Sequence, residues 1–174
     1  MNYLLIISCS QRKVETDGLL PAIDRYDGPT YRSLRKFRDT NLDNKFPNNL
    51  RILILSAKFG LIHPETEIPA YDLKMTAGRA EEIRHEVKLD LYHCLHFYKI
   101  AYGGMDQVFI NLGKNYRRTL EGFHWGTIAT MEASGGIGLK TQQMKAWLER
   151  IFQEERVSVV SEGEAYNLAK KADN

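Results

Sequence analysis

The sequence has few cysteines, no long apolar run and little net charge. Cys9 and Cys94 are the 2 cysteines among 174 residues, too few for a disulfide framework or a closed zinc site. No apolar run approaches the ~20 residues that a membrane span needs, and the apolar stretch at residues 3–7 is too short for a signal peptide. These absences favour a cytoplasmic protein, and we expect it to hold neither a metal nor a cofactor.

The formal net charge is only +2, so the chain lacks the overall basic signature of many nucleic-acid-binding proteins. Basic residues are nevertheless concentrated in two places, between Gln11 and Arg38 and around Lys114, Arg117 and Arg118. Such clusters are often solvated helix faces. Beside a pocket, they would suit a ligand that bears phosphate.

Hydrophobic residues form 43% and charged residues 26% of the chain, which is typical of one soluble globular domain. Apolar stretches predict four strands, at residues 3–8, 50–55, 107–112 and, more weakly, 124–131. Helical periodicity separates them, at residues 30–38, 76–98, 115–120 and 139–152. This alternation predicts an α/β fold, a single three-layer domain with a mostly parallel four-stranded sheet flanked by helices. We expect the domain to span residues 1–157 and a polar tail to follow at residues 158–174.

Each predicted strand is followed by small, polar or basic residues. These segments are Ser8–Lys13, Ser56–Gly60, Asn111–Arg117 and Met131–Thr141. Ligands of open α/β sheets bind outside the carboxyl ends of the strands, so we expect the four segments to line one shared pocket. The last segment carries three glycines before Lys140 and Thr141, a pattern that fits an anion site at a helix N-terminus and fits a plain turn equally well.

The stretch after the second strand reads SAKFGLIHPETEIPAYDLKM. Pro64 and Pro69 stiffen it, and we expect it to return Tyr71 and Asp72 toward the pocket. Asp27, in the motif DRYDGP, is better explained by a turn before a helix than by a ligand contact. Cys9 follows a strand, but no histidine is near it in sequence, which favours a buried cysteine over a catalytic thiol.

Four motifs resemble a family of small bacterial and phage-associated proteins, long known as a domain of unknown function: SCSQRK, YDGPTYRSLR, ILSAKFGLIHPETEIPAYDLKM and LGKNYRRTL. That family is similar to the base-handling domain of archaeosine synthase and, more remotely, to the uracil-DNA glycosylase superfamily. The likeness spans about residues 3–150, and the block at residues 54–75 is its most specific part. The uracil-DNA glycosylase motifs GQDPY and HPSPL are absent, so the resemblance supports the fold and the reaction class rather than particular residues.

The resemblance implies a uracil-DNA-glycosylase-like domain that removes a modified base, with glucosylated hydroxymethylcytosine in phage DNA as the expected substrate. The product would be an abasic site, the partner would be DNA, and the biological role would be phage defence. Two alternatives remain open. One is an N-ribohydrolase or base-exchange transferase that acts on free nucleosides or nucleotides, and the other is a nucleic-acid-binding module without enzymatic activity.

For base removal, the expected catalytic residues are Asp72, Asn111 and Lys58. Asp72 would activate water or stabilise the oxocarbenium-like state, and the amide of Asn111 would contact the edge of the base. The expected contacts to the base are Cys9, Ser10, Tyr26, Asp27, Phe59 and Tyr71. The expected contacts to phosphate are Arg12, Lys13, Lys114, Arg117, Lys140 and Thr141.

Overall fold

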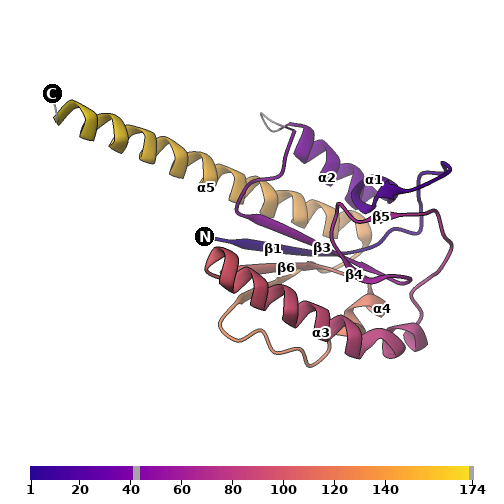
Figure 1. Cartoon of the computed structure of the whole chain (residues 1–174). Helices are drawn as coiled ribbons and strands as arrows, with labels where there is room; N and C mark the ends of the chain where they lie inside the picture. Colours follow the sequence, from indigo (N-terminus) through magenta and orange to yellow (C-terminus); the bar gives the residue numbers. More distant parts are fainter. Residues whose placement is uncertain (41–43, 173–174) are drawn as a thin grey trace.

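Figure 1 shows the computed structural model of the chain, which describes residues 1–40 and 44–172, with side chains through Glu154. Its helices are α1 (Ala22–Arg25), α2 (Pro29–Asp39), α3 (Ala77–Tyr102), α4 (Lys114–Arg117) and α5 (Ile137–Ala172). A 3₁₀ turn, η1 (Arg118–Leu120), follows α4. No helix among the described residues is both long enough and apolar enough to cross a bilayer.

The main sheet of the described chain has five strands. Their spatial order is β4 (Gly60–Ile62), β3 (Leu50–Ser56), β1 (Tyr3–Ser8), β6 (Gln107–Asn111) and β7 (Ala129–Glu132). β1 pairs in parallel with both β3 and β6, so that Ile6 lies opposite Leu53 and Ile110. A small separate sheet pairs β2 (Leu20–Pro21) with β5 (Glu67–Ile68).

The predicted α/β class and mostly parallel sheet are confirmed, but the predicted number of four strands is wrong. The chain turns back after β3, and β4 adds an antiparallel edge strand in which Gly60 pairs with Ser56. Gly60 has a φ of 67°, a left-handed conformation that glycine adopts without strain. The weak strand predicted at residues 124–131 is also displaced, because a turn at Trp125–Ile128 delays β7 until Ala129.

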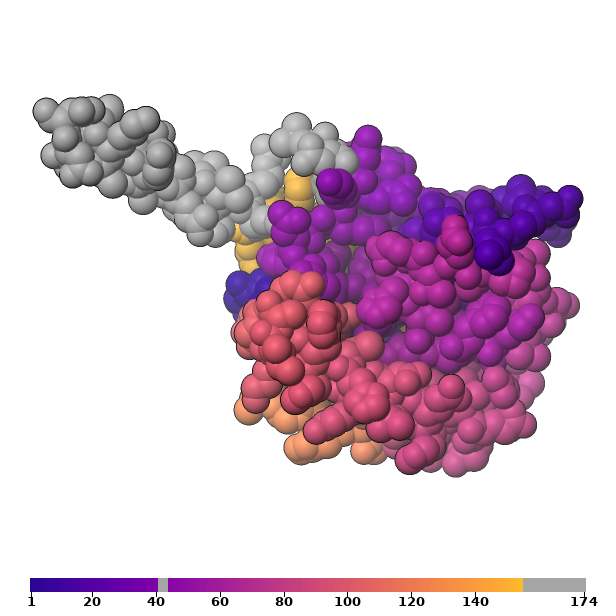
Figure 2. Space-filling view, viewed as in Figure 1, coloured from indigo at the N-terminus to yellow at the C-terminus, as the bar shows by residue number. Residues whose placement is uncertain are grey.

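The continuous apolar runs of β1 and β3 are explained by helices on both faces of the sheet (Figure 1). On one face, Leu4 and Ile6 of β1 pack into a cluster with Val87 and Leu91 of α3. On the other face, side chains of β1 and β3 pack with Leu34 of α2 and with residues of α5. Residues of α3 form much of the lower surface in the space-filling view of Figure 2. This arrangement is the expected three-layer domain.

The predicted start of the long helix agrees with the structure, whereas its predicted end at residue 98 lies before the observed end at Tyr102. α3 begins after Thr76, whose Oγ1 accepts a hydrogen bond from the Arg79 amide at 3.0 Å. It ends at Gly103, which has a φ of 82°. The helix predicted at residues 139–152 lies within α5. The side chains beyond Glu154 are outside the described part, so the expected boundary at residue 157 stays a prediction.

Candidate functional site

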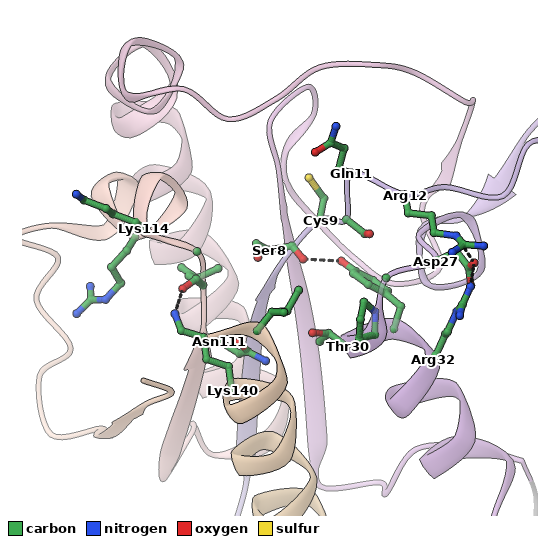
Figure 3. Close-up of a pocket in the computed structure, with 18 of the residues that line it drawn as sticks. Ser8, Cys9, Gln11, Arg12, Asp27, Thr30, Arg32, Asn111, Lys114 and Lys140 are labelled. Atoms are coloured by element: carbon green, nitrogen blue, oxygen red, sulfur yellow. Dashed lines mark hydrogen bonds and ion pairs between the residues drawn. The ribbon is translucent and has the colours of Figure 1, made fainter. Parts of the chain in front are cut away.

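A pocket of about 620 Å³ opens at the carboxyl ends of β1, β6 and β7 (Figure 3). It is lined by residues from the end of β1, the start of α2, the end of β6, the end of β7 and the start of α5. This location is where α/β sheets bind ligands, and the volume falls within the range of small-molecule sites. Three of the four predicted strand-end segments contribute to the lining. Ser56–Gly60 does not, because it forms the turn into β4.

One side of the pocket carries an arginine group, which we define as Arg12, Arg32 and the carboxylate of Asp27 between them. Arg32 donates to Asp27 Oδ2 at 2.6 Å and to Oδ1 at 3.1 Å. The Nε of Arg12 lies 3.2 Å from Oδ2, and Arg35 donates to Oδ1 at 2.8 Å. The hydrogen bonds from Arg32 are the main reason that the pKa of Asp27 falls to about 2. Asp27 is therefore ionised at neutral pH, and its oxygens are already engaged with arginines rather than free for a base.

The other side carries a lysine group, which we define as Lys114, Arg117 and Lys140 together with Glu132. Arg117 forms an ion pair with Glu132, and the ammonium of Lys140 donates to the Leu112 carbonyl at 2.6 Å. Lys114 is exposed and has no hydrogen-bond or ion-pair partner within the described chain. Figure 3 shows Lys114 and Lys140 across the pocket from Arg12 and Arg32.

The floor between the two groups is formed by Ser8, Cys9 and Asn111. Asn111 is 6% exposed, and its Nδ2 lies 3.6 Å from the sulfur of Met144, which is a weak acceptor. The amide therefore keeps hydrogen-bonding capacity for a ligand. Cys9 is a free thiol, and its Sγ lies 3.0 Å from the hydroxyl of Tyr116.

Charge in the pocket is strongly unbalanced. Among the described residues, five cationic side chains and two carboxylates line it, an excess of three positive charges. The whole chain has a net charge of only +2, so the positive charge is concentrated at this site. Such an excess favours an anionic ligand.

Beside the pocket lies a cluster of hydroxyl groups formed by Tyr26, Ser56 and Tyr71. The hydroxyls of Tyr26 and Tyr71 are 2.6 Å apart, and the Tyr71 hydroxyl is 2.8 Å from Ser56 Oγ. Burial, followed by the nearby Cys9, raises the pKa of both tyrosines well above the usual value. Both hydroxyls are therefore protonated at neutral pH and act as hydrogen-bonding groups rather than bases.

Lys13, which was expected to contact phosphate, and Lys58, which was expected to be catalytic, both lie over this hydroxyl cluster. The ammonium of Lys13 lies 4.2 Å from the centre of the Tyr71 ring, and that of Lys58 lies 5.4 Å from the same ring. Burial lowers the pKa of Lys13, an effect that Cys9 and Asp72 partly oppose. Lys13 and Asp72 are thus electrostatic neighbours outside the pocket lining.

The structure divides the predicted site residues into two sets. Those that it brings together in the pocket are Cys9, Ser10, Arg12, Asp27, Asn111, Lys114, Arg117 and Lys140. Those that do not line the pocket are Lys13, Tyr26, Lys58, Phe59, Tyr71, Asp72 and Thr141. Contrary to expectation, the segment at residues 64–69 does not return Tyr71 and Asp72 to the pocket lining, because β5 pairs with β2 and leads the chain over the hydroxyl cluster.

Two further placements differ from the expected roles. Asp72 is exposed to solvent, whereas a water-activating carboxylate needs to face the reacting atoms. Thr141 is buried, and its Oγ1 donates to the Ile137 carbonyl at 2.8 Å within α5. Its hydroxyl hydrogen is therefore used within the helix and is not available to a phosphate.

Arg32 and Glu132 line the pocket but were not predicted as site residues. Arg32 belongs to the basic run between Gln11 and Arg38, so a sequence signal existed, but that run does not indicate which arginine faces the pocket. Glu132 ends β7 and lies within the segment Met131–Thr141 that was expected to line the pocket, but nothing in that segment singles it out as a site residue.

Comparisons with known proteins identify a family for this chain. No curated protein matches the chain. A crystal structure of AF0587, described as a protein of unknown function, aligns with 87% of this chain at 18% identity and a TM-score of 0.37, and the alignment covers 43% of that chain. A family of unknown function, DUF6884, matches residues 4–150, which include every segment of the pocket. The chain belongs to the DUF6884 family.

Proposed function

We propose that the protein is a DNA glycosylase that hydrolyses the N-glycosidic bond of a modified base, glucosylated hydroxymethylcytosine in phage DNA, within the cytoplasm. The observation that carries the proposal is the cation-lined pocket of about 620 Å³ at the carboxyl edge of the sheet. A pocket of this kind suits one nucleotide extruded from a duplex, and its cations match the flanking phosphates. The four sequence motifs resemble a family that is similar to base-handling enzymes, and this resemblance supports the same reaction class.

In the proposed reaction, the bond between C1′ of the sugar and the nitrogen of the base breaks. The electron pair leaves with the base, water adds to C1′, and the water's proton ends on the base. The transition state has oxocarbenium character, and negative charge develops on the departing base. Donors aimed at that charge lower the barrier, and Asn111 Nδ2 on the pocket floor is such a donor.

In this proposal, carboxylates have a smaller catalytic role than the sequence predicts. The carboxylates that line the pocket among the described residues are Asp27 and Glu132, and both are paired with arginines. Asp72 is exposed and outside the lining. We therefore assign the larger catalytic contribution to stabilisation of the leaving base by Asn111.

The test incubates the protein with DNA duplexes that differ only in cytosine modification, and measures alkali-labile strand breaks. We expect breaks on DNA with glucosylated hydroxymethylcytosine and none on unmodified DNA. Asn111→Ala should lower the single-turnover rate about 10²-fold, the effect typical of removing one transition-state donor. Lys145→Gln, an exposed position of α5 outside the pocket, is the matched control and should keep the parent rate.

Asp72→Asn, measured in parallel, compares the sequence-based assignment with the structural one. Full loss of activity in Asp72→Asn with activity retained in Asn111→Ala would transfer the catalytic role to Asp72. No breaks on any modified DNA would reject the glycosylase proposal.

A second candidate is an N-ribohydrolase or base-exchange transferase that acts on free nucleotides. The low net charge of +2 favours it, because an enzyme for a small ligand needs no extended basic surface. Release of base from a mononucleotide, without abasic sites in any DNA, would select this candidate.

A further inference from the structure

The cations of the pocket form two separate groups rather than one continuous patch. Arg12 and Arg32 lie on one side, where both contact Asp27. Lys114 and Lys140 lie on the opposite side, beyond Asn111 (Figure 3). The floor residues Ser8 and Cys9 lie between the two groups.

The arginine group keeps donors for a ligand after its internal contacts are made. Asp27 is a single carboxylate shared by three arginines, Arg12, Arg32 and the more buried Arg35. One negative charge cannot neutralise three positive charges, so an excess remains. The side chains of Arg12 and Arg32 are 70% and 52% exposed, and a guanidinium has five N–H donors, of which Asp27 occupies at most two.

The lysine group also keeps free capacity. The ion pair with Glu132 neutralises Arg117, but Lys114 has no hydrogen-bond or ion-pair partner within the described chain. The Lys140 ammonium uses one of its three N–H donors on the Leu112 carbonyl. Both lysines of this side therefore keep N–H donors for an anion.

From this geometry we infer that the pocket takes a nucleotide with two separate phosphate groups, one bound by the arginine group and one by the lysine group. A nucleotide within a strand has this form, with a 5′ phosphate and a 3′ phosphate on either side of its sugar. A nucleoside monophosphate would leave one group of cations unoccupied, and the adjacent phosphates of a diphosphate would both bind on one side. The inference rests on the proposed function in taking the ligand to be a nucleotide.

The test measures the affinity of the full chain for cytidine 3′,5′-bisphosphate, cytidine 5′-diphosphate and cytidine 5′-monophosphate by isothermal titration calorimetry. The first two ligands each carry two phosphates and differ in where the second phosphate lies. We expect the 3′,5′-bisphosphate to bind at least about tenfold more tightly than either of the others, because a second charge-assisted contact contributes about that factor.

Variants assign each phosphate to its side of the pocket. Arg32→Gln and Lys114→Gln should each weaken binding of the 3′,5′-bisphosphate about tenfold, whereas only one of the two should weaken binding of the monophosphate. Lys145→Gln removes an equal charge from the same protein outside the pocket and should leave all three affinities unchanged. Circular dichroism melts would verify that each variant is folded.

Two results would overturn the inference: the diphosphate binds as tightly as the 3′,5′-bisphosphate, or both variants weaken monophosphate binding equally. Failure of the proposed function gives a different result. Preference for the 3′,5′-bisphosphate without abasic-site formation would reject the glycosylase and keep the two-phosphate site. Glycosylase activity without that preference would reject the two-phosphate site alone.

Discussion

At the residue scale, Asp27 organises the arginine side of the pocket. The Asp27 carboxylate connects the loop after β1 to α2, because it pairs with Arg12 of the loop and with Arg32 and Arg35 of the helix. Arg35 also donates to the carbonyls of Ile23 and Tyr26, which ties the carboxylate to the backbone before α2. Asp27 therefore positions the arginines and, through Arg35, stabilises the backbone that precedes α2.

The depressed pKa of Asp27 predicts a pH dependence of stability. The folded state lowers this pKa from 3.8 to about 2, so the folded state binds the proton less readily than the unfolded state. The stabilising effect of the ionised Asp27 carboxylate is complete above about pH 4 and is lost as the pH falls through about 2. Asp27→Asn should therefore unfold at lower urea concentration than the parent at pH 7, and the difference should shrink below pH 4.

Urea titrations at a series of pH values measure this effect, and Asp39→Asn is the control, since Asp39 is exposed and pairs with Arg38. A destabilisation of Asp27→Asn that stays constant from pH 7 to pH 2 would contradict the assignment of the effect to the charge of Asp27.

Sequence reasoning placed some site residues and missed others for physical reasons. Asn111 and Lys114 were predictable because they directly follow a strongly apolar strand, and strand ends meet at one edge of the sheet. Asp72 was misplaced because a two-residue pairing, β2 with β5, redirects the chain. Such short pairings leave no periodic pattern in a sequence. Arg32 could not be selected among neighbouring arginines without the orientation of α2.

At the element scale, the start of α2 depends on a close approach between two loops. Gly28 immediately precedes α2, and a Cβ at this position would lie 2.5 Å from Ser10 Oγ and 3.1 Å from Ser10 Cβ. The absence of a side chain therefore lets α2 approach the segment that follows β1. Both segments line the pocket, so we expect a change at this contact to alter the arginine side.

Gly28→Ala should displace Ser10 and separate the two segments. We expect a loss of about 1–3 kcal/mol in the free energy of unfolding, the usual effect of overpacking, and weaker binding of cytidine 3′,5′-bisphosphate. Gly78→Ala is the matched control, because a Cβ there would meet only Thr76 Oγ1 at 3.9 Å, within the first turns of α3. That variant should be neutral or more stable. Equal stability of the two variants would show that the contact with Ser10 is unimportant.

Long elements were the easiest to predict from the sequence. α3 has a continuous apolar stripe and a threonine cap, so its period and its start were predicted, whereas the predicted end at residue 98 lies short of the observed end at Tyr102. β4 was missed because it has three residues and follows β3 through a tight turn. An edge strand of this length is stabilised by its neighbour rather than by its own composition.

At the scale of the whole molecule, the distribution of charge distinguishes the proposed enzyme from a general nucleic-acid-binding module. Among the described residues, the pocket has an excess of three positive charges, while the whole chain has a net charge of +2. The remainder of the chain is therefore close to neutral. It offers little long-range attraction to DNA beyond the pocket.

This distribution predicts a shallow salt dependence of DNA binding. If the five cations that line the pocket make all phosphate contacts, the slope of log K against log[KCl] for single-stranded DNA is no steeper than about −3.5, at about −0.7 for each phosphate neutralised. Fluorescence anisotropy between 50 and 300 mM KCl measures this slope. Arg32→Gln should reduce its magnitude by about 0.7, and Lys145→Gln should not change it. A slope near −7, unaffected by Arg32→Gln, would mean that a broad surface binds DNA, which is the behaviour of a non-enzymatic binding module.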